Sequence, residues 1–127
     1  MSDRIPLESE HVSQRKLMAW ARLNQHIYRD LELMFAVPNA AKRTKFTSGK
    51  MLAEGLRKGV PDVFLPCPNK AGKIGLAIEM KRHPNKPTRE QEWWLEQLAQ
   101  RGWETWVCWS FEEAVEKTLS YLTNRKR

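Results

Sequence analysis

Two short apolar segments joined by a turn-rich connection place the strongest constraint on how this chain can fold. Residues 63–66 and 74–80 have the composition of buried strands, and a Pro-Asn-Lys-Ala-Gly cluster lies between them. A hairpin that places Asp62 opposite Glu79 has its midpoint inside this cluster, where turn residues are concentrated. The pattern therefore predicts an antiparallel strand pair with two acidic residues directly opposite each other.

The alternation of side chains along a strand groups the charged residues of the second segment. Glu79 and Lys81 point to one face, so with Asp62 on the neighbouring strand two carboxylates and an ammonium share one patch. Such carboxylates repel one another unless a cation compensates, and a divalent metal ion supplies that compensation. Hard oxygen ligands select Mg²⁺ or Mn²⁺, which stabilise charge on a scissile phosphate. Lys81 could then orient the attacking water, and a salt bridge to Asp62 or Glu79 is its structural alternative.

The order of helical and strand patterns predicts an α/β fold, with a mixed sheet covered by helices on both faces. Thr88 and Gln91 form a capping box at the start of one helix, and Ser9 and Ser110 are expected N-caps of two others. For residues 33–37 a continued helix is the alternative to a strand. The predicted helices cover about residues 9–24, 43–57, 88–101 and 111–122, and the further strands cover residues 33–37 and 103–109.

Length and composition indicate one folded domain over residues 1–127, with a core of about residues 9–122. The 41% hydrophobic content and six tryptophans argue against disorder, and we expect the tryptophans in the core or at a subunit contact. No apolar run approaches the roughly 20 residues of a membrane span, and no export signal is evident, so we expect a cytoplasmic protein without membrane contact. Cys67 and Cys108 are then expected as reduced core thiols, and the histidines are too scattered for zinc.

The formal charge of +7 points to a polyanionic partner, with nucleic acid ahead of a membrane surface. Between residues 42 and 58 six basic side chains accompany one acidic side chain, Glu54. A solvated surface is the usual explanation for such a run, but its position just before Asp62 favours contacts with phosphates. The basic residues assigned to nucleic-acid binding are Lys42, Arg43, Lys45, Lys50, Arg57 and Lys58.

Three sequence strings together resemble the VRR-NUC domain, a branch of the PD-(D/E)xK nuclease superfamily, over about residues 10–122. They are Gly55-Leu-Arg-Lys-Gly-Val-Pro-Asp, Ile78-Glu-Met-Lys and Thr88-Arg-Glu-Gln, accompanied by an early Glu10-x-x-x-Gln14 and a Pro38-Asn39 turn with Arg43 following. The resemblance implies a restriction-endonuclease-like sheet. It also implies metal ligation by Glu10, Asp62, Glu79 and the main-chain carbonyl of Met80, a catalytic Lys81, a Gln91 near the site and a nucleic-acid contact at Asn39.

Two of these assignments have alternatives in the sequence itself. Glu8 competes with Glu10 as the distal acid, because a helix start cannot be placed within a residue or two from sequence. Gln91 already has a structural role in the capping box.

The resemblance also implies a function. Stand-alone members of the family resemble phage or prophage homodimers that cut branched DNA, including four-way junctions. The leading prediction is therefore a Mg²⁺- or Mn²⁺-dependent, structure-selective DNA endonuclease that resolves Holliday junctions. The alternatives are a non-catalytic DNA-binding module and a sequence-specific restriction-type endonuclease.

Overall fold

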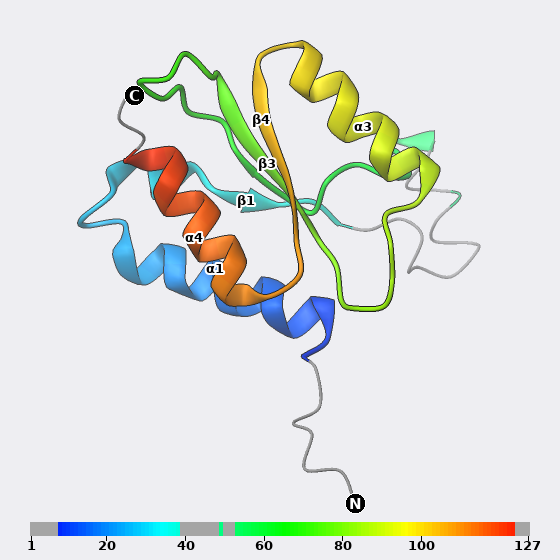
Figure 1. The fold of residues 1–127 in the computed structure, drawn as a ribbon, viewed down its shortest axis with the longest axis horizontal. Helices are drawn as coiled ribbons and strands as arrows, with labels where there is room; N and C mark the ends of the chain where they lie inside the picture. Colours follow the sequence, from blue (N-terminus) through cyan, green and yellow to red (C-terminus); the bar gives the residue numbers. More distant parts are fainter. Residues whose placement is uncertain (1–7, 39–48, 50–52, 124–127) are drawn as a thin grey trace, which may run out of the picture.

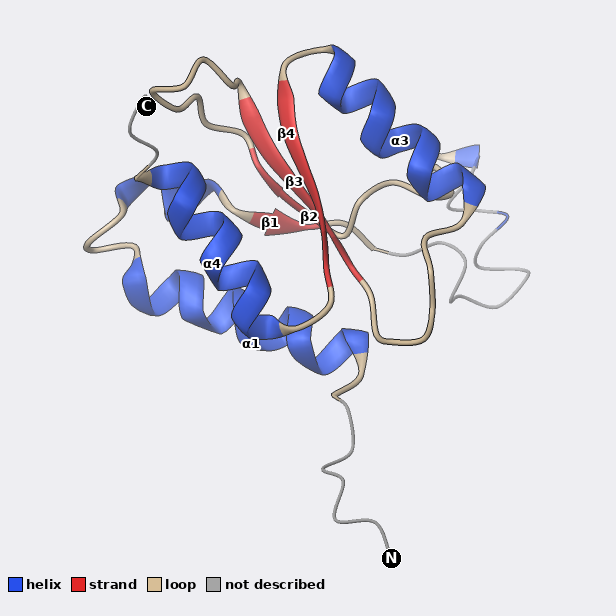
Figure 2. Cartoon of the chain, viewed as in Figure 1, coloured by secondary structure: helices blue, strands red, loops and turns tan. Residues whose placement is uncertain are grey.

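The computed structural model describes residues 8–38, 49 and 53–123, which form a mixed sheet between layers of helices (Figure 1). Helices α1 and α4 cover one face of the sheet, and α3 lies on the other (Figure 2). The helices are α1 (Glu10–Asn24), the short 3-10 helix η1 (Arg29–Leu33), α3 (Arg89–Gln100) and α4 (Phe111–Leu122); the strands are β1 (Phe35–Ala36), β2 (Val63–Leu65), β3 (Gly75–Met80) and β4 (Trp103–Cys108). The α/β fold class predicted from the sequence is confirmed.

The four strands pair in the order β1-β2-β3-β4. Strands β1 and β2 are antiparallel, β2 and β3 are antiparallel, and β3 runs parallel to β4. Val63 lies opposite Ile78, and this register places Asp62 opposite Glu79, as the hairpin midpoint predicted. Because β3 and β4 are parallel, a crossover connection has to join them, and α3 is that crossover.

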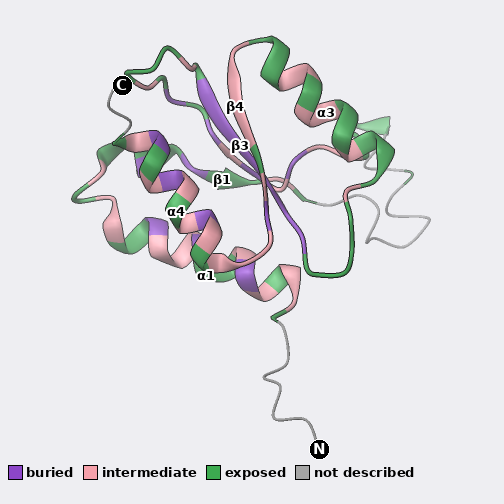
Figure 3. Cartoon of the chain, viewed as in Figure 1, coloured by how far each residue is buried: buried purple, intermediate pink, exposed green. Residues whose placement is uncertain are grey.

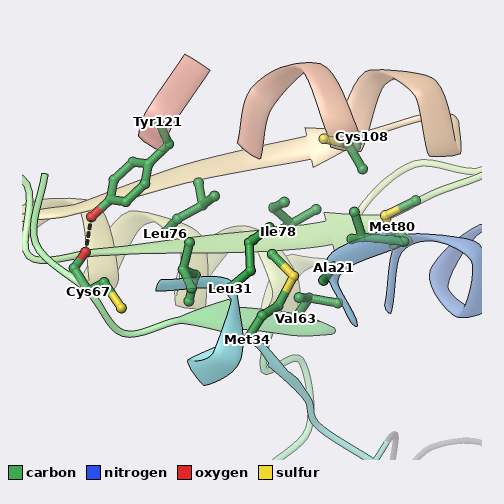
Figure 4. Close-up of a cluster of buried hydrophobic side chains, with 13 residues drawn as sticks. Ala21, Leu31, Met34, Val63, Cys67, Leu76, Ile78, Met80, Cys108 and Tyr121 are labelled. Carbon is green, nitrogen blue, oxygen red and sulfur yellow. Dashed lines mark hydrogen bonds between the residues drawn. The ribbon is translucent and has the colours of Figure 1, made fainter. Parts of the chain in front are cut away.

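The core lies between the sheet and helices α1 and α4 (Figure 4). Strand β3 is its centre and is buried along its whole length (Figure 3). Each fully buried Leu, Ile or Met side chain contributes about 1.5–3 kcal/mol to folding. The buried side chains that meet here come mainly from three elements: Leu17 and Ala21 of α1, Leu76, Ile78 and Met80 of β3, and Ala114 and Tyr121 of α4. The strand end that carries Glu79 is thus fixed by apolar packing.

Side-chain caps fix the starts of α1, α3 and α4. The hydroxyl of Ser9 accepts a hydrogen bond from the Val12 N–H at 3.1 Å, which sets the first turn of α1. Thr88 and Gln91 form the predicted capping box at the start of α3. Ser110 caps α4, as expected. These local signals were legible in the sequence because a cap needs only residues three positions apart.

Two predicted elements differ from the structure. Leu33 ends η1 and Phe35–Ala36 form β1, so residues 33–37 contain the end of a helix and a short strand rather than either alone. Most of the helix predicted over residues 43–57 lies outside the described residues. Its predicted end is wrong, however: Gly55 has φ +107, a backbone conformation that stops a helix two residues before residue 57.

The cysteines and tryptophans take different environments. Cys67 and Cys108 are buried free thiols, as expected, and burial raises the pKa of Cys108 to about 12. None of the six tryptophans is fully buried. Trp20 packs against the core, whereas Trp93 and Trp106 are exposed, so the core placement is wrong for those two, and a subunit contact stays a prediction. No helix among the described residues is long and apolar enough to cross a membrane.

Candidate active site

Three charged side chains converge where β3 ends. Glu79 is only 2% exposed and Lys81 only 9% exposed, and Lys81 Nζ lies 3.7 Å from Glu79 Oε2. Asp62, directly before β2, is brought in by the register of the strand pair, and its Oδ2 accepts a hydrogen bond from the Met80 N–H at 2.8 Å. The structure therefore brings together the two carboxyl groups and the ammonium that the strand pattern grouped.

The electrostatics of this cluster disfavour ionisation of Glu79. Burial is the main cause that raises the pKa of Glu79 to about 9, and the charge of Asp62 adds to it. The ammonium of Lys81 opposes the shift, while a hydrogen bond with the Asp62 carboxyl and the charge of Glu10 raise the pKa further. One nearby lysine is thus insufficient to compensate several acids in a region of low polarity.

Glu10 reaches the same cluster from the first turn of α1. Its Oε2 accepts hydrogen bonds from the Arg82 N–H at 3.3 Å and from Asn85 Nδ2 at 3.5 Å, and both donors follow Lys81 in the chain. Glu8 instead pairs with Lys16 and accepts a hydrogen bond from the Ser13 hydroxyl at 3.1 Å. Glu8 is thus held against its own helix, and Glu10 is the acid that α1 directs towards Glu79.

The loop after Lys81 is anchored by contacts that the sequence did not suggest. The Lys81 N–H donates to the Cys108 carbonyl at 2.9 Å, which extends the pairing of β3 with β4 past the strand. The ring of His83 stacks on Trp109 with 4.3 Å between centroids. Asn85 was not predicted as a site residue either. Its position between two prolines, just after the Glu-x-Lys string, is the sequence signal that could have identified it.

The other predicted site residues fall into three groups. The oxygen of the Gln91 side chain accepts a hydrogen bond from the Thr88 N–H at 2.8 Å, so its amide oxygen is engaged in the helix cap. Arg57 and Lys58 lie beside Trp94, on the α3 side of the sheet. The other residues predicted to contact nucleic acid lie outside the described residues: Asn39, Lys42, Arg43, Lys45 and Lys50.

The chemistry of the donor set suits a hard divalent cation. Oε1 of Glu79 is buried, and no hydrogen-bond donor of the described residues reaches it. A buried, unsatisfied carboxylate oxygen beside a second carboxyl group is the ligand type that Mg²⁺ and Mn²⁺ bind. Within the described ranges, no three His, Cys, Asp or Glu side chains already stand as a complete metal-binding group. Mg²⁺ is commonly held by one or two carboxylates while it keeps several waters. Asp62 and Glu79 can provide these two carboxylates.

Comparison with known proteins agrees with the fold and with the strings that surround this site. The sequence signature of the VRR-NUC domain matches residues 8–112. A solved structure described as a VRR_NUC domain protein superimposes with a TM-score of 0.76 over 95% of this chain and 93% of that chain, at 19% sequence identity. A comparison with curated proteins found no match. Because the signature covers most of the chain and the architecture agrees with it, this chain belongs to the VRR-NUC domain family, which includes nucleases.

Proposed function

We propose that this protein is a metal-dependent DNA endonuclease that cuts branched DNA, four-way junctions included. The observation that carries the proposal is the buried cluster at the end of β3, where Lys81 Nζ lies 3.7 Å from Glu79 Oε2 and Asp62 stands opposite. A buried lysine beside a buried carboxyl group with one unsatisfied oxygen is an arrangement that stability alone does not favour. A positively charged chain with this cluster suits a polyanionic substrate.

The residues of the cluster have separate roles in this proposal. Asp62, Glu79 and the main-chain carbonyl of Met80 would hold Mg²⁺ or Mn²⁺, with Glu10 as the distal acid. When bound, the cation supplies charge stabilisation at the scissile phosphate and a more acidic water. The ammonium of Lys81 donates hydrogen bonds to the attacking water or to a phosphate oxygen, and the main chain of Lys81 is held by the hydrogen bond from its N–H to the Cys108 carbonyl.

Main-chain hydrogen bonds that orient two of the acids make these roles depend on the fold. The Met80 N–H holds one oxygen of Asp62, and the Arg82 N–H holds one oxygen of Glu10. Both acids are therefore oriented by main-chain donors of one short segment, which also carries Lys81. Orientation by fixed donors limits reorganisation when substrate charge develops.

Strand cutting tests the proposal with a variant that keeps the fold. Purified protein should nick a labelled four-way junction in Mn²⁺ and leave it intact in a chelator. Asp62→Asn keeps an oxygen that accepts the Met80 N–H but removes the charge, so we expect cutting to fall at least about a hundredfold with little change in thermal stability. Glu96→Gln on the exposed side of α3 is the control and should cut normally. No nicks in Mn²⁺, or full activity in Asp62→Asn, would show that the proposal is wrong.

Selectivity for branched DNA is tested with matched substrates. A four-way junction and a linear duplex containing the same arm sequences are incubated separately with the protein and Mn²⁺. We expect the junction to be cut faster. Equal rates would leave a metal-dependent nuclease but remove the structure selectivity.

A further inference from the structure

A groove between the segment before β2 and the N-terminal half of α3 is not used by the catalytic cluster. It has a volume of about 520 Å³, within the size range of small-molecule sites. Its floor and walls combine two tryptophans with three basic side chains and one acid: Arg57, Lys58, Arg89, Glu90, Trp93 and Trp94.

The walls of the groove are fixed by contacts between the two segments. Trp94 Nε1 donates to the Lys58 carbonyl at 3.1 Å, and the Arg57 guanidinium carbon lies 5.9 Å from the centre of the Trp94 ring. Gly59 has φ +84, and a Cβ there would stand 2.6 Å from the Cβ of Glu90. Only glycine permits this approach, so the basic segment is held against α3 with its cations at the rim.

Trp93 presents an aromatic surface to solvent inside this basic rim. Its side chain is 51% exposed although α3 packs on the sheet through other residues, and it meets Trp94 edge to face with 5.4 Å between ring centroids. Trp94 is thus held by the protein, and it braces Trp93. An exposed, braced ring is an effective stacking surface because little side-chain freedom remains to be lost when a planar group binds it.

We propose that this groove binds an unpaired nucleotide of the DNA strand, with the base stacked on Trp93 and the adjoining phosphates at Arg57, Lys58 and Arg89. An aromatic face with an excess of cations is complementary to a planar base on an anionic backbone, and stacking of this kind tolerates any base sequence. A paired duplex keeps its bases inside the helix, so only a strand with unpaired bases can occupy the groove.

The position of the groove links it to the proposed nuclease site, and the inference rests on that proposed function. Lys58 precedes Asp62 by four residues, so their Cα atoms are at most about 14 Å apart. A strand whose phosphate lies at the carboxyl cluster could therefore place a nearby unpaired base in the groove. The groove would then favour single-stranded tails and branch points with unpaired bases over plain duplex.

Strand binding in a chelator tests this without any cutting. The probes are an oligothymidylate strand and a fully abasic strand of the same length, which has the same phosphates and no bases. Trp93→Ala in the full chain should weaken binding of oligothymidylate about 5- to 150-fold and leave binding of the abasic strand unchanged. Trp93→Phe should recover part of the loss. Trp106→Ala, which removes an exposed tryptophan packed on Lys117 elsewhere, is the matched control and should bind both strands normally.

Several outcomes would overturn the inference. Equal losses for both strands, or none for either, would remove base stacking from the account. A shift from dimer to monomer in Trp93→Ala would show instead that a second copy of the chain covers the groove. A photoreactive iodouracil strand adds a readout on the unchanged protein: adducts at Trp93 or Trp94 support the inference, and adducts only elsewhere contradict it.

The binding assay also separates this inference from the nuclease proposal. Trp93-dependent binding by a protein that never cuts DNA would retain the groove and reject the nuclease. Normal cutting and normal strand binding by Trp93→Ala would retain the nuclease proposal and reject the groove.

Discussion

At the residue scale, Glu79 is a buried acid whose ionisation the fold opposes. Its carboxyl group is buried, opposed by Asp62 and only partly compensated by Lys81, so its pKa is raised to about 9 from an ordinary value of 4.5. The folded protein without metal therefore holds a proton on Glu79 that the unfolded chain releases at lower pH. A cation placed between the acids would relieve the same conflict by charge rather than by protonation.

This conflict predicts a pH dependence of stability in a chelator. Between pH 4.5 and about 9 the folded state binds more protons at Glu79 than the unfolded state, so the free energy of unfolding should decrease as pH rises through this window. Glu79→Gln removes the titrating group and should flatten the decline. Denaturant unfolding followed at several pH values measures both proteins, with Glu96→Gln as the control. Parallel pH profiles for Glu79→Gln and the unchanged protein would contradict the pKa shift.

We expect substitutions of the two acids near the start of α1 to differ in their effect on DNA cutting. Glu10 is held by the Arg82 N–H beside the cluster, whereas Glu8 pairs with Lys16 on its own helix. Glu10→Ala should lower Mn²⁺-dependent cutting of a four-way junction at least about tenfold, and Glu8→Ala should leave it within about twofold. A larger loss in Glu8→Ala than in Glu10→Ala would assign the distal acid to Glu8.

At the scale of elements, the contact of the Lys58–Gly59 segment with α3 positions both the basic rim and the approach to Asp62. Gly59 and Gly72 both have positive φ, but only the Cβ of a residue at 59 would meet other atoms within 4 Å. Comparing Gly59 with Gly72 therefore separates the effect of backbone conformation on stability from the effect of close packing.

Alanine at these two glycines should differ in its effect on stability. Gly72→Ala is expected to lower the free energy of unfolding by about 1 kcal/mol, because alanine resists positive φ. Gly59→Ala carries the same strain and also a 2.6 Å contact with Glu90 Cβ and a 2.7 Å contact with its main-chain carbon, so its loss should be clearly larger. Thermal or urea unfolding measures the difference, and equal losses would mean that the loop moves away from α3 without penalty.

At the scale of the whole molecule, the predictable features depended on short-range patterns. The register of β2 and β3 follows from strand alternation and one turn cluster, and the α3 cap follows from residues three positions apart. The approach of Glu10 to Glu79 spans 69 positions and depends on how α1 packs on the sheet. The sequence alone could therefore not decide whether Glu8 or Glu10 is the distal acid. The docking of Trp94 on Lys58 likewise depends on a contact with no sequence period, whereas the helix stop at Gly55 is a local glycine signal.

The surface of the whole molecule also bears on the homodimer that the family resemblance implies. Apolar side chains are exposed around the end of α1 and in the segment that follows it: Leu23, Ile27, Leu33 and Phe35. A two-fold dimer that buries them would present two active sites to a nearly two-fold junction. Sedimentation should then give the mass of a dimer at micromolar concentration, and a combined Leu23→Asp and Ile27→Asp variant should sediment as a monomer. A monomeric unchanged protein would exclude this arrangement.

If the buried cluster at the end of β3 carries out DNA cleavage as we propose, single-turnover cutting of a four-way junction in Mn²⁺ has to depend on Lys81. Lys81→Ala is compared with Lys70→Ala, which removes the same charge from an exposed residue in the turn at the opposite end of the β2–β3 pair. We expect Lys81→Ala to cut at least about a hundredfold more slowly and Lys70→Ala to cut at the normal rate. Equal rates for the two variants would contradict the proposal.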